Sequence, residues 1–232
     1  MAKKKPAEQE VNEAQVTLSK FERYFAENKK SLTIIFGAII LVLGGYFGYR
    51  IFYKAPRETK SREMIWKAQH YFDVKVGTNE ADSFKLAKEG KDSFYGFEYI
   101  TNEFDGTMAG EIAQYCFGII LLNEGRYDEA IEHLEGVDVE DLLISSMTIG
   151  LTGDAYSELG DYDQAIAKYK EAAEHNENEF TTPLYLKKAA ILYEEKGDYS
   201  SALDLYETIR DKYEKSAQGG DIDKYIARAK NK

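Results

Sequence analysis

A short motif of glycine, tyrosine and alanine returns at near-constant intervals in the second half of this 232-residue chain. It reads Gly-x-Tyr-x-x-Ala-Ile/Leu and begins at Gly125, Gly160 and Gly197, so that successive copies start 35 and 37 residues apart. A period of this length indicates small stacked units, because one such unit cannot bury its own apolar face. We therefore expect an all-α solenoid in this part of the chain rather than a single central core.

Each copy of the motif lies between two segments with helical periodicity. The glycine suits the left-handed conformation that commonly ends a helix, and the alanine five residues later lets a second helix approach closely. Ahead of each glycine, a small residue is followed three positions later by a large one: Gly118 with Leu121, Gly153 with Tyr156, and Ala190 with Tyr193. In the second helices, one large residue is predicted to fill the space toward the next unit: Leu134, Tyr169 and Tyr206.

This pattern resembles the tetratricopeptide repeat, a unit of about 34 residues built from two antiparallel helices. The chain departs from the family at the usual tryptophan of the first helix, where Gln114, Ile149 and Leu186 stand, and it lacks the final proline. We assign three repeats to residues 111–214 and a capping helix with the C-terminus to residues 215–232.

Residues 54–110 are assigned to a linker and a degenerate helical repeat. Helical periodicity in this region predicts helices over residues 62–74 and 81–88. Residues 97–104 share an aromatic and isoleucine pattern with residues 206–213, and this likeness predicts the second helix of an early, degenerate unit there.

A second strong feature is the apolar segment of residues 32–53, which we assign to a transmembrane helix. Residues 32–49 contain no formal charge. As a helix, residues 32–52 would span about 31 Å, close to the ~30 Å hydrocarbon core of a bilayer. Arg50 and the aromatic residues around it suit the headgroup region at one end of the span.

The flanks of this segment leave its orientation open. Residues 17–31 carry four basic residues and residues 53–67 carry five, which is too even for the positive-inside rule to decide. Residues 1–31 are predicted to form a tail with a short amphipathic helix, since apolar residues recur at helical spacing from Val11 to Phe25. This helix would either lie on the membrane surface or lead, solvated, into the span.

Three glycines, Gly37, Gly44 and Gly48, share one face of the predicted span. Gly44 and Gly48 form a Gly-x-x-x-Gly pair, a spacing that lets a second transmembrane helix approach closely. The pair is also common by chance in apolar segments. A helix contact through this face is therefore a hypothesis.

The charge and the reactive residues favour protein binding over other functions. The net charge is −11, and residues 63–232 alone carry −17, which disfavours nucleic acid as a partner. The histidines His70, His133 and His175 are isolated, and the sequence has no phosphate-binding loop or nucleophile motif. The single cysteine, Cys116, is assigned to packing. We expect no enzymatic activity, no metal site and no cofactor.

In stacked helical hairpins the first helices line a concave groove. Helical phase places nine candidate protein-binding residues there: Ile112, Tyr115, Ile119, Leu122, Met147, Asp154, Leu184, Lys187 and Ile191. The groove begins apolar and turns mixed in charge, and the Lys/Asn carboxylate clamp of some tetratricopeptide proteins is absent. This character suits an extended or partly unfolded apolar polypeptide. For each residue, packing between repeats is the alternative.

The combination of a short basic tail, one span and an acidic repeat domain resembles the YfgM-like family of Gram-negative bacteria. Two stretches are particularly similar to its Bacteroidetes members: ENKKSLTIIFGAIILVLGGYFGYR and EFTTPLYLKKAAILYEEKGDYSSAL. The resemblance implies an inner-membrane protein with its N-terminus in the cytoplasm and its repeats in the periplasm. It also implies three partners: the Sec translocon core (SecYEG), a membrane-anchored peptidyl-prolyl isomerase of the PpiD type, and emerging polypeptide clients.

These observations lead to a membrane-anchored adaptor or chaperone that assists polypeptides beside the translocon. Two alternatives stay open. The chain could be a tetratricopeptide scaffold of another envelope assembly or secretion machine, or an adaptor that faces the cytoplasm with reversed topology.

Overall fold

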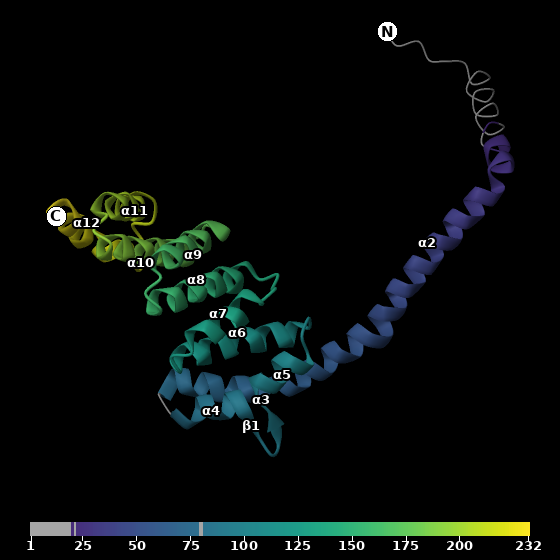
Figure 1. Cartoon of the computed structure of the whole chain (residues 1–232), viewed down its shortest axis with the longest axis horizontal. Coiled ribbons are helices and arrows are strands. Elements are labelled where there is room, and N and C mark those ends of the chain that lie inside the picture. Colours follow the sequence, from purple (N-terminus) through teal and green to yellow (C-terminus); the bar gives the residue numbers. More distant parts are fainter. Residues whose placement is uncertain (1–19, 21, 79–80) are drawn as a thin grey trace, which may run out of the picture. The chain divides into compact units, whose positions relative to one another are not determined.

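The structure, a computed structural model, describes residues 20, 22–78 and 81–232 (Figure 1). The chain divides between Pro56 and Arg57 into two compact units. The amphipathic helix predicted in the N-terminal tail lies mostly outside the described residues.

The first unit contains the predicted span as helix α2 (Lys29–Tyr49), which has 21 residues and none of them buried. Its apolar side chains are exposed on all sides; Leu41, for example, is 77% exposed and Ile34 is 72% exposed. A helix that is apolar all round needs an apolar environment. Among the described residues, this is the helix that is long and apolar enough to cross a membrane.

The helical course does not stop where the predicted span ends. A π-helical turn, η1 (Arg50–Lys54), follows α2 directly, and in it the Ala55 N–H donates to the Arg50 carbonyl. Helix α3 (Ala55–Thr78) begins at the next residue. Pro56 has no N–H to donate, and a π turn just ahead of it shifts the hydrogen-bond ladder by one residue. The structure therefore has helix where we predicted a linker, and the helix predicted over residues 62–74 begins earlier.

The second unit contains the three predicted repeats as consecutive helix pairs (Figure 1). The pairs are α6 (Met108–Asn123) with α7 (Tyr127–Glu135), α8 (Leu142–Glu158) with α9 (Tyr162–His175), and α10 (Thr181–Glu195) with α11 (Tyr199–Lys212). A short 3-10 turn, η2 (Gly219–Asp221), then leads into the capping helix α12 (Ile222–Lys230). The predicted fold class, an apolar N-terminal helix followed by a tetratricopeptide solenoid with a cap, is confirmed.

The repeat motif acts in the way that its residue types predict. Gly125, Gly160 and Gly197 have φ angles of 75°, 79° and 77°, a conformation that side chains with a Cβ rarely adopt. The motif alanines Ala130, Ala165 and Ala202 are all 0% exposed. The small residues of the first helices also matter for packing. A Cβ on Gly118 would lie 2.7 Å from Leu134, and one on Gly153 would lie 2.8 Å from Tyr169.

The region upstream of the repeats contains one element that the sequence did not predict. Between α4 (Ala81–Glu89) and α5 (Phe97–Glu103) lies a hairpin of two short antiparallel strands, β1 (Gly90–Lys91) and β2 (Phe94–Tyr95). Strands of two residues are too short to show an alternating pattern. The helices predicted over residues 81–88 and 97–104 correspond to α4 and α5.

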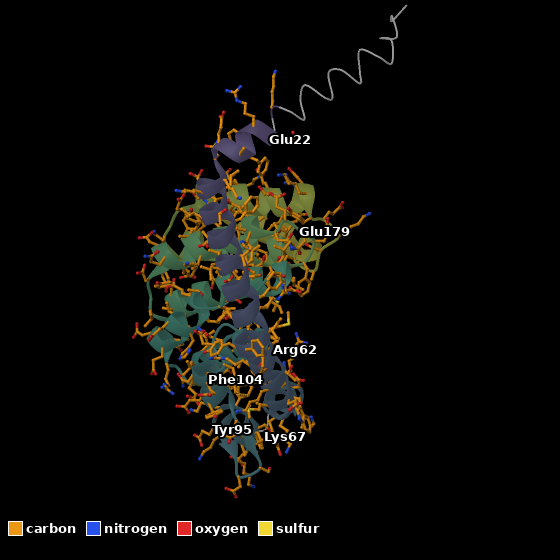
Figure 2. All side chains as sticks on the ribbon, turned by 90° about the vertical axis from the view of Figure 1, so that its right-hand side faces the viewer. Glu22, Arg62, Lys67, Tyr95, Phe104 and Glu179 are labelled. Carbon is orange, nitrogen blue, oxygen red and sulfur yellow. The ribbon has the colours of Figure 1, made fainter. Side chains whose placement is uncertain are left out.

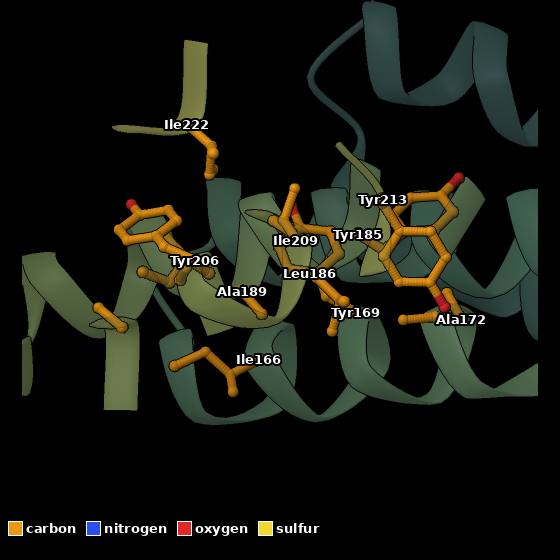
Figure 3. Packing of buried hydrophobic residues seen from close by; sticks show 14 of the residues in the cluster. Ile166, Tyr169, Ala172, Tyr185, Leu186, Ala189, Tyr206, Ile209, Tyr213 and Ile222 are labelled. Atoms are coloured by element: carbon orange, nitrogen blue, oxygen red, sulfur yellow. The ribbon is translucent and has the colours of Figure 1, made fainter. Parts of the chain in front are cut away.

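Two clusters of buried apolar residues stabilise the second unit. One joins residues of α3 to α7 and includes Phe97, Ile100 and Ile120, each 0% exposed. The other joins α9 to α12 and includes Tyr206 and Ile209, both 0% exposed (Figure 3). Cys116 belongs to the first cluster, and its burial raises the thiol pKa to about 12. It is therefore a packing residue rather than a reactive thiol.

Candidate functional site

The nine predicted groove residues lie on the first helices α6, α8 and α10, and every one of them is half-buried. Four of them pack against one of the two core clusters, and the other five do not. Ile112, Tyr115 and Leu122 pack against the first core cluster, and Leu184 packs against the second. These four residues support the fold as well as any ligand, so the alternative of packing between repeats applies to them.

Tyr115 is the clearest example, because much of its side chain is buried. Burial raises the pKa of its phenol to about 12, with the neighbouring Cys116 thiol as a smaller cause. The hydroxyl therefore stays neutral at physiological pH. Replacing Tyr115 would perturb the core, so this residue is a poor probe of binding alone.

Three of the predicted apolar residues belong to neither core cluster of the described chain: Ile119 on α6, Met147 on α8 and Ile191 on α10. Their half-exposed side chains are the apolar surface that the groove leaves for a ligand. Methionine is unbranched and adapts to irregular surfaces, which suits contacts with polypeptides of varied sequence.

The middle of the groove contains a polar network around Asp154. The Asp154 carboxylate accepts a hydrogen bond from the Tyr169 hydroxyl at 2.6 Å and an ion pair from Lys188 at 2.6 and 2.8 Å. The Lys188 ammonium also lies 5.5 Å from the centre of the Tyr169 ring and 5.9 Å from that of Tyr185. Asp154 is therefore neutralised within the chain. Lys188 and Tyr185 could not be predicted from the sequence as members of this network, because their role depends on which face of α10 meets α8.

The C-terminal end of the groove is bonded to the cap. Lys187 donates to Asp221 at 2.8 Å and lies 4.3 Å from the centre of the Tyr225 ring, while Arg228 of α12 pairs with Glu194. Lys187 and Lys224 hold the pKa of the Asp221 carboxyl down to about 2. Lys187 is therefore engaged by α12, and a ligand would have to compete for it. A cavity of about 590 Å³ beside Ile191 remains open there.

One glycine of the groove is required by a close contact between repeats. A Cβ on Gly150 would lie 2.0 Å from Cε1 of Tyr185, whose ring fills the space between α8 and α10.

We expect Gly150→Ala to destabilise the repeat domain by about 1–2 kcal/mol, because the strain of overpacking exceeds the gain in helix propensity. Urea unfolding followed by circular dichroism measures this change. Gly220→Ala is the control, since a Cβ at Gly220 meets nothing within 4 Å. An unchanged midpoint for Gly150→Ala would contradict the packing of Tyr185 on α8.

The glycine face of α2 has no partner among the described residues. A Cβ on Gly37, Gly44 or Gly48 would meet nothing within 4 Å. A contact with a second transmembrane helix through this face stays a prediction.

The described residues offer little for catalysis or metal binding. No group of three or more His, Cys, Asp or Glu among them could hold a metal ion. The one Ser–His contact, Ser145 with His175 at 2.9 Å, is exposed at the ends of two helices. The arrangement instead offers an apolar surface flanked by compensated charges, which is a surface for binding.

The comparisons with known proteins agree with this geometry. Residues 151–217 match the family model of the tetratricopeptide repeat. The repeat solenoid of this chain is a tetratricopeptide one. The matched residues run from within α8 to five residues past the end of α11 and so include two of the three motif glycines, Gly160 and Gly197.

Among solved structures, one similar chain is titled "Crystal structure of PcrH in complex with the chaperone binding region of PopB". The two are 21% identical, and the match covers 55% of this chain and 97% of that chain with a TM-score of 0.43. A TM-score this low establishes no functional likeness. None of the curated proteins compared matches this chain.

Proposed function

We propose that this protein is a membrane-anchored adaptor or chaperone that binds polypeptide segments beside the Sec translocon, on the periplasmic side of the inner membrane. It acts by binding and carries out no catalysis. The observation that carries the proposal is that one chain contains both an exposed apolar helix, α2, and a tetratricopeptide groove. Some apolar side chains of this groove belong to neither core cluster. The likeness of the sequence to YfgM-like proteins supports the translocon and the periplasm as the setting.

The chemistry of the groove suits transient holding of apolar segments. Ile119, Met147 and Ile191 offer small apolar areas, and apolar burial contributes about 25 cal/mol for each Å² removed from water. Between them, the Asp154–Lys188 pair is already neutral, so an uncharged polypeptide meets no unpaired charge there. We therefore expect weak, reversible binding with little dependence on one exact sequence.

Anchoring makes such weak binding effective. A binding site tethered to the membrane near a source of clients experiences a high local concentration of them. A scaffold of another envelope assembly would need instead one stable and stoichiometric partner.

Photo-crosslinking tests the groove. We expect Ile119→Glu with Met147→Glu to reduce crosslinking from groove positions to a secreted client by about tenfold, since each buried carboxylate without a partner costs more than 1 kcal/mol. These positions replace Tyr115 as probes because neither residue belongs to a core cluster.

The matched control places the same two charges elsewhere. Ala167 and Ser200 are exposed on the second helices α9 and α11, so Ala167→Glu with Ser200→Glu should leave crosslinking unchanged. If the groove variant also crosslinks like the wild type, the groove is not the client site and the scaffold function gains support.

A further inference from the structure

One edge of the solenoid is strongly acidic. It contains the end of α7 with the start of α8, and the end of α9 with the start of α10, which lie along the same side of the stack (Figure 1). Residues 135–146 and 174–183 hold seven acidic residues and no Lys or Arg. All seven are exposed: Glu135, Asp138, Glu140, Asp141, Glu174, Glu177 and Glu179. We call this surface the acidic edge.

Most of these carboxylates have no basic partner in the described chain. Glu135 pairs with Lys168 at 3.4 Å, and Asp141 caps α8 by accepting the N–H groups of Leu143 and Ile144 at 2.9 Å. The other five form no ion pair with described residues. The opposite edge differs, because Arg126 and Lys196 in its connections pair with Glu129 and Asp163.

The neighbouring connections at this edge have basic residues in or beside them, which limits the acidic edge to the middle of the stack. Arg57 donates to the carbonyl of Glu103 at 2.7 Å beside the start of α6. At the other end, Lys212 is the last residue of α11, and Lys215 follows Glu214 directly.

The acidic edge also exposes large apolar side chains. Phe180 is 64% exposed, Leu142 is 55% exposed and Leu143 is 43% exposed. A cavity of about 350 Å³ at this edge is lined by residues of α7, α8 and α9, and Val137, Ile149 and Lys168 are among the residues that line it. Apolar side chains beside unpaired charges of one sign are unusual on a solvated surface and are typical of an interaction site.

The shape of the acidic edge is fixed by its own hydrogen bonds. The Glu111 carboxylate of α6 accepts the Asp138 N–H at 2.7 Å. The Asn178 side chain accepts the N–H groups of Phe180 and Thr181, both at 2.8 Å. Ser145 and His175 join the two connections at 2.9 Å. Such a pre-ordered surface loses little conformational entropy when a partner binds.

We propose that the acidic edge binds a cationic amphipathic segment of a partner protein. The apolar side chains of that segment would lie on Leu142, Leu143 and Phe180, and its Lys or Arg side chains would pair with Glu140, Glu177 and Glu179. The charge identifies the occupant: a bilayer presents zwitterionic or anionic headgroups, and a second copy of this domain is itself acidic. The acidic edge is a surface separate from the groove, and this proposal does not depend on the proposed function.

Peptide binding to the full chain in phosphatidylcholine nanodiscs tests the proposal. The probe is a labelled 18-residue peptide of leucine and lysine in a helical amphipathic pattern, and its binding is followed by fluorescence anisotropy, with empty nanodiscs as the blank. We expect Glu140→Lys with Glu179→Lys to raise the Kd about tenfold, because two attractions become repulsions. Leu142→Ser with Phe180→Ser should also weaken binding severalfold.

The control variant is Glu158→Lys with Glu195→Lys, which changes the net charge equally near the opposite edge and should change the Kd less than twofold. Ile119→Glu with Met147→Glu should leave the Kd unchanged, which separates the acidic edge from the groove. The proposal would be overturned if both lysine variants raised the Kd of the peptide equally. It would also be overturned if Leu142→Ser with Phe180→Ser left the Kd unchanged. The oligomeric mass of the chain is also measured in the absence of peptide. If Glu140→Lys with Glu179→Lys changes this mass, the occupant of the acidic edge is a second copy of the chain, and the proposal is overturned.

Discussion

Leu41→Arg together with Val42→Arg is expected to remove the chain from the membrane. Both residues lie in the middle of α2 and are 77% and 71% exposed, so their side chains face whatever surrounds the helix. An arginine at the centre of a transmembrane helix costs about 2.5–3.5 kcal/mol. Two of them together would shift the insertion equilibrium by more than a thousandfold, and neither lies near enough to a helix end to reach the headgroups.

Carbonate extraction of membranes measures this effect. The wild-type chain should stay in the pellet and the arginine variant should move to the supernatant. Leu41→Val with Val42→Leu keeps the apolar volume and should stay in the pellet. If the arginine variant also resisted extraction, α2 would not be the anchor and the membrane part of our interpretation would be wrong.

Tyr206→Ala is expected to destabilise the C-terminal part of the solenoid by about 3–5 kcal/mol, the usual cost of truncating a buried aromatic residue. Tyr206 of α11 is 0% exposed. Its hydroxyl donates to Glu194 of α10 at 3.0 Å, and the centre of its ring lies 5.4 Å from that of the Tyr225 ring of α12. One side chain therefore joins both helices of the third repeat to the cap.

Hydrogen exchange is the appropriate measurement, because the stability of a solenoid is a sum of local terms. Tyr206→Ala should reduce the protection of amides in α10, α11 and α12 and leave α6 and α7 nearly unchanged. Tyr206→Phe keeps the ring and removes only the bond to Glu194, so it should cost about 1 kcal/mol. Uniform loss of protection over all repeats would contradict a solenoid with local stability.

The repeat architecture could be predicted because its requirements are local. A positive φ at Gly125, Gly160 and Gly197 and close packing at Ala130, Ala165 and Ala202 each demand one residue type at a fixed position. The same holds for α2, where length and apolarity suffice. These features do not depend on what other parts of the chain do.

Other features depend on tertiary contacts that no local pattern contains. Through the π turn before Pro56 the chain stays helical where we predicted a linker. The cap engages Lys187 through Asp221, although helical phase placed Lys187 in the groove. Tyr115 similarly has the phase of a groove residue, but much of its ring is buried in the core.

The pairing of the charged side chains is the feature that the sequence predicts least. The sequence shows an acidic domain and leaves open which carboxylates are neutralised. Figure 2 shows charged side chains over the second unit, Arg62, Lys67 and Glu179 among them. Glu135, for example, pairs with Lys168 at 3.4 Å, whereas Glu179 forms no ion pair with the described residues. The lack of ion pairs and the exposed apolar side chains together distinguish the acidic edge from the rest of the surface.

We propose above that this chain is anchored in a membrane by α2 and works beside the Sec translocon. The most direct test is affinity purification of the full chain from native membranes in a gentle detergent, with mass spectrometry of the proteins that accompany it. We predict recovery of the translocon core and a membrane-anchored peptidyl-prolyl isomerase, with yields reduced by Leu41→Arg with Val42→Arg. Stoichiometric recovery of a different envelope complex, without the translocon, would contradict the claim.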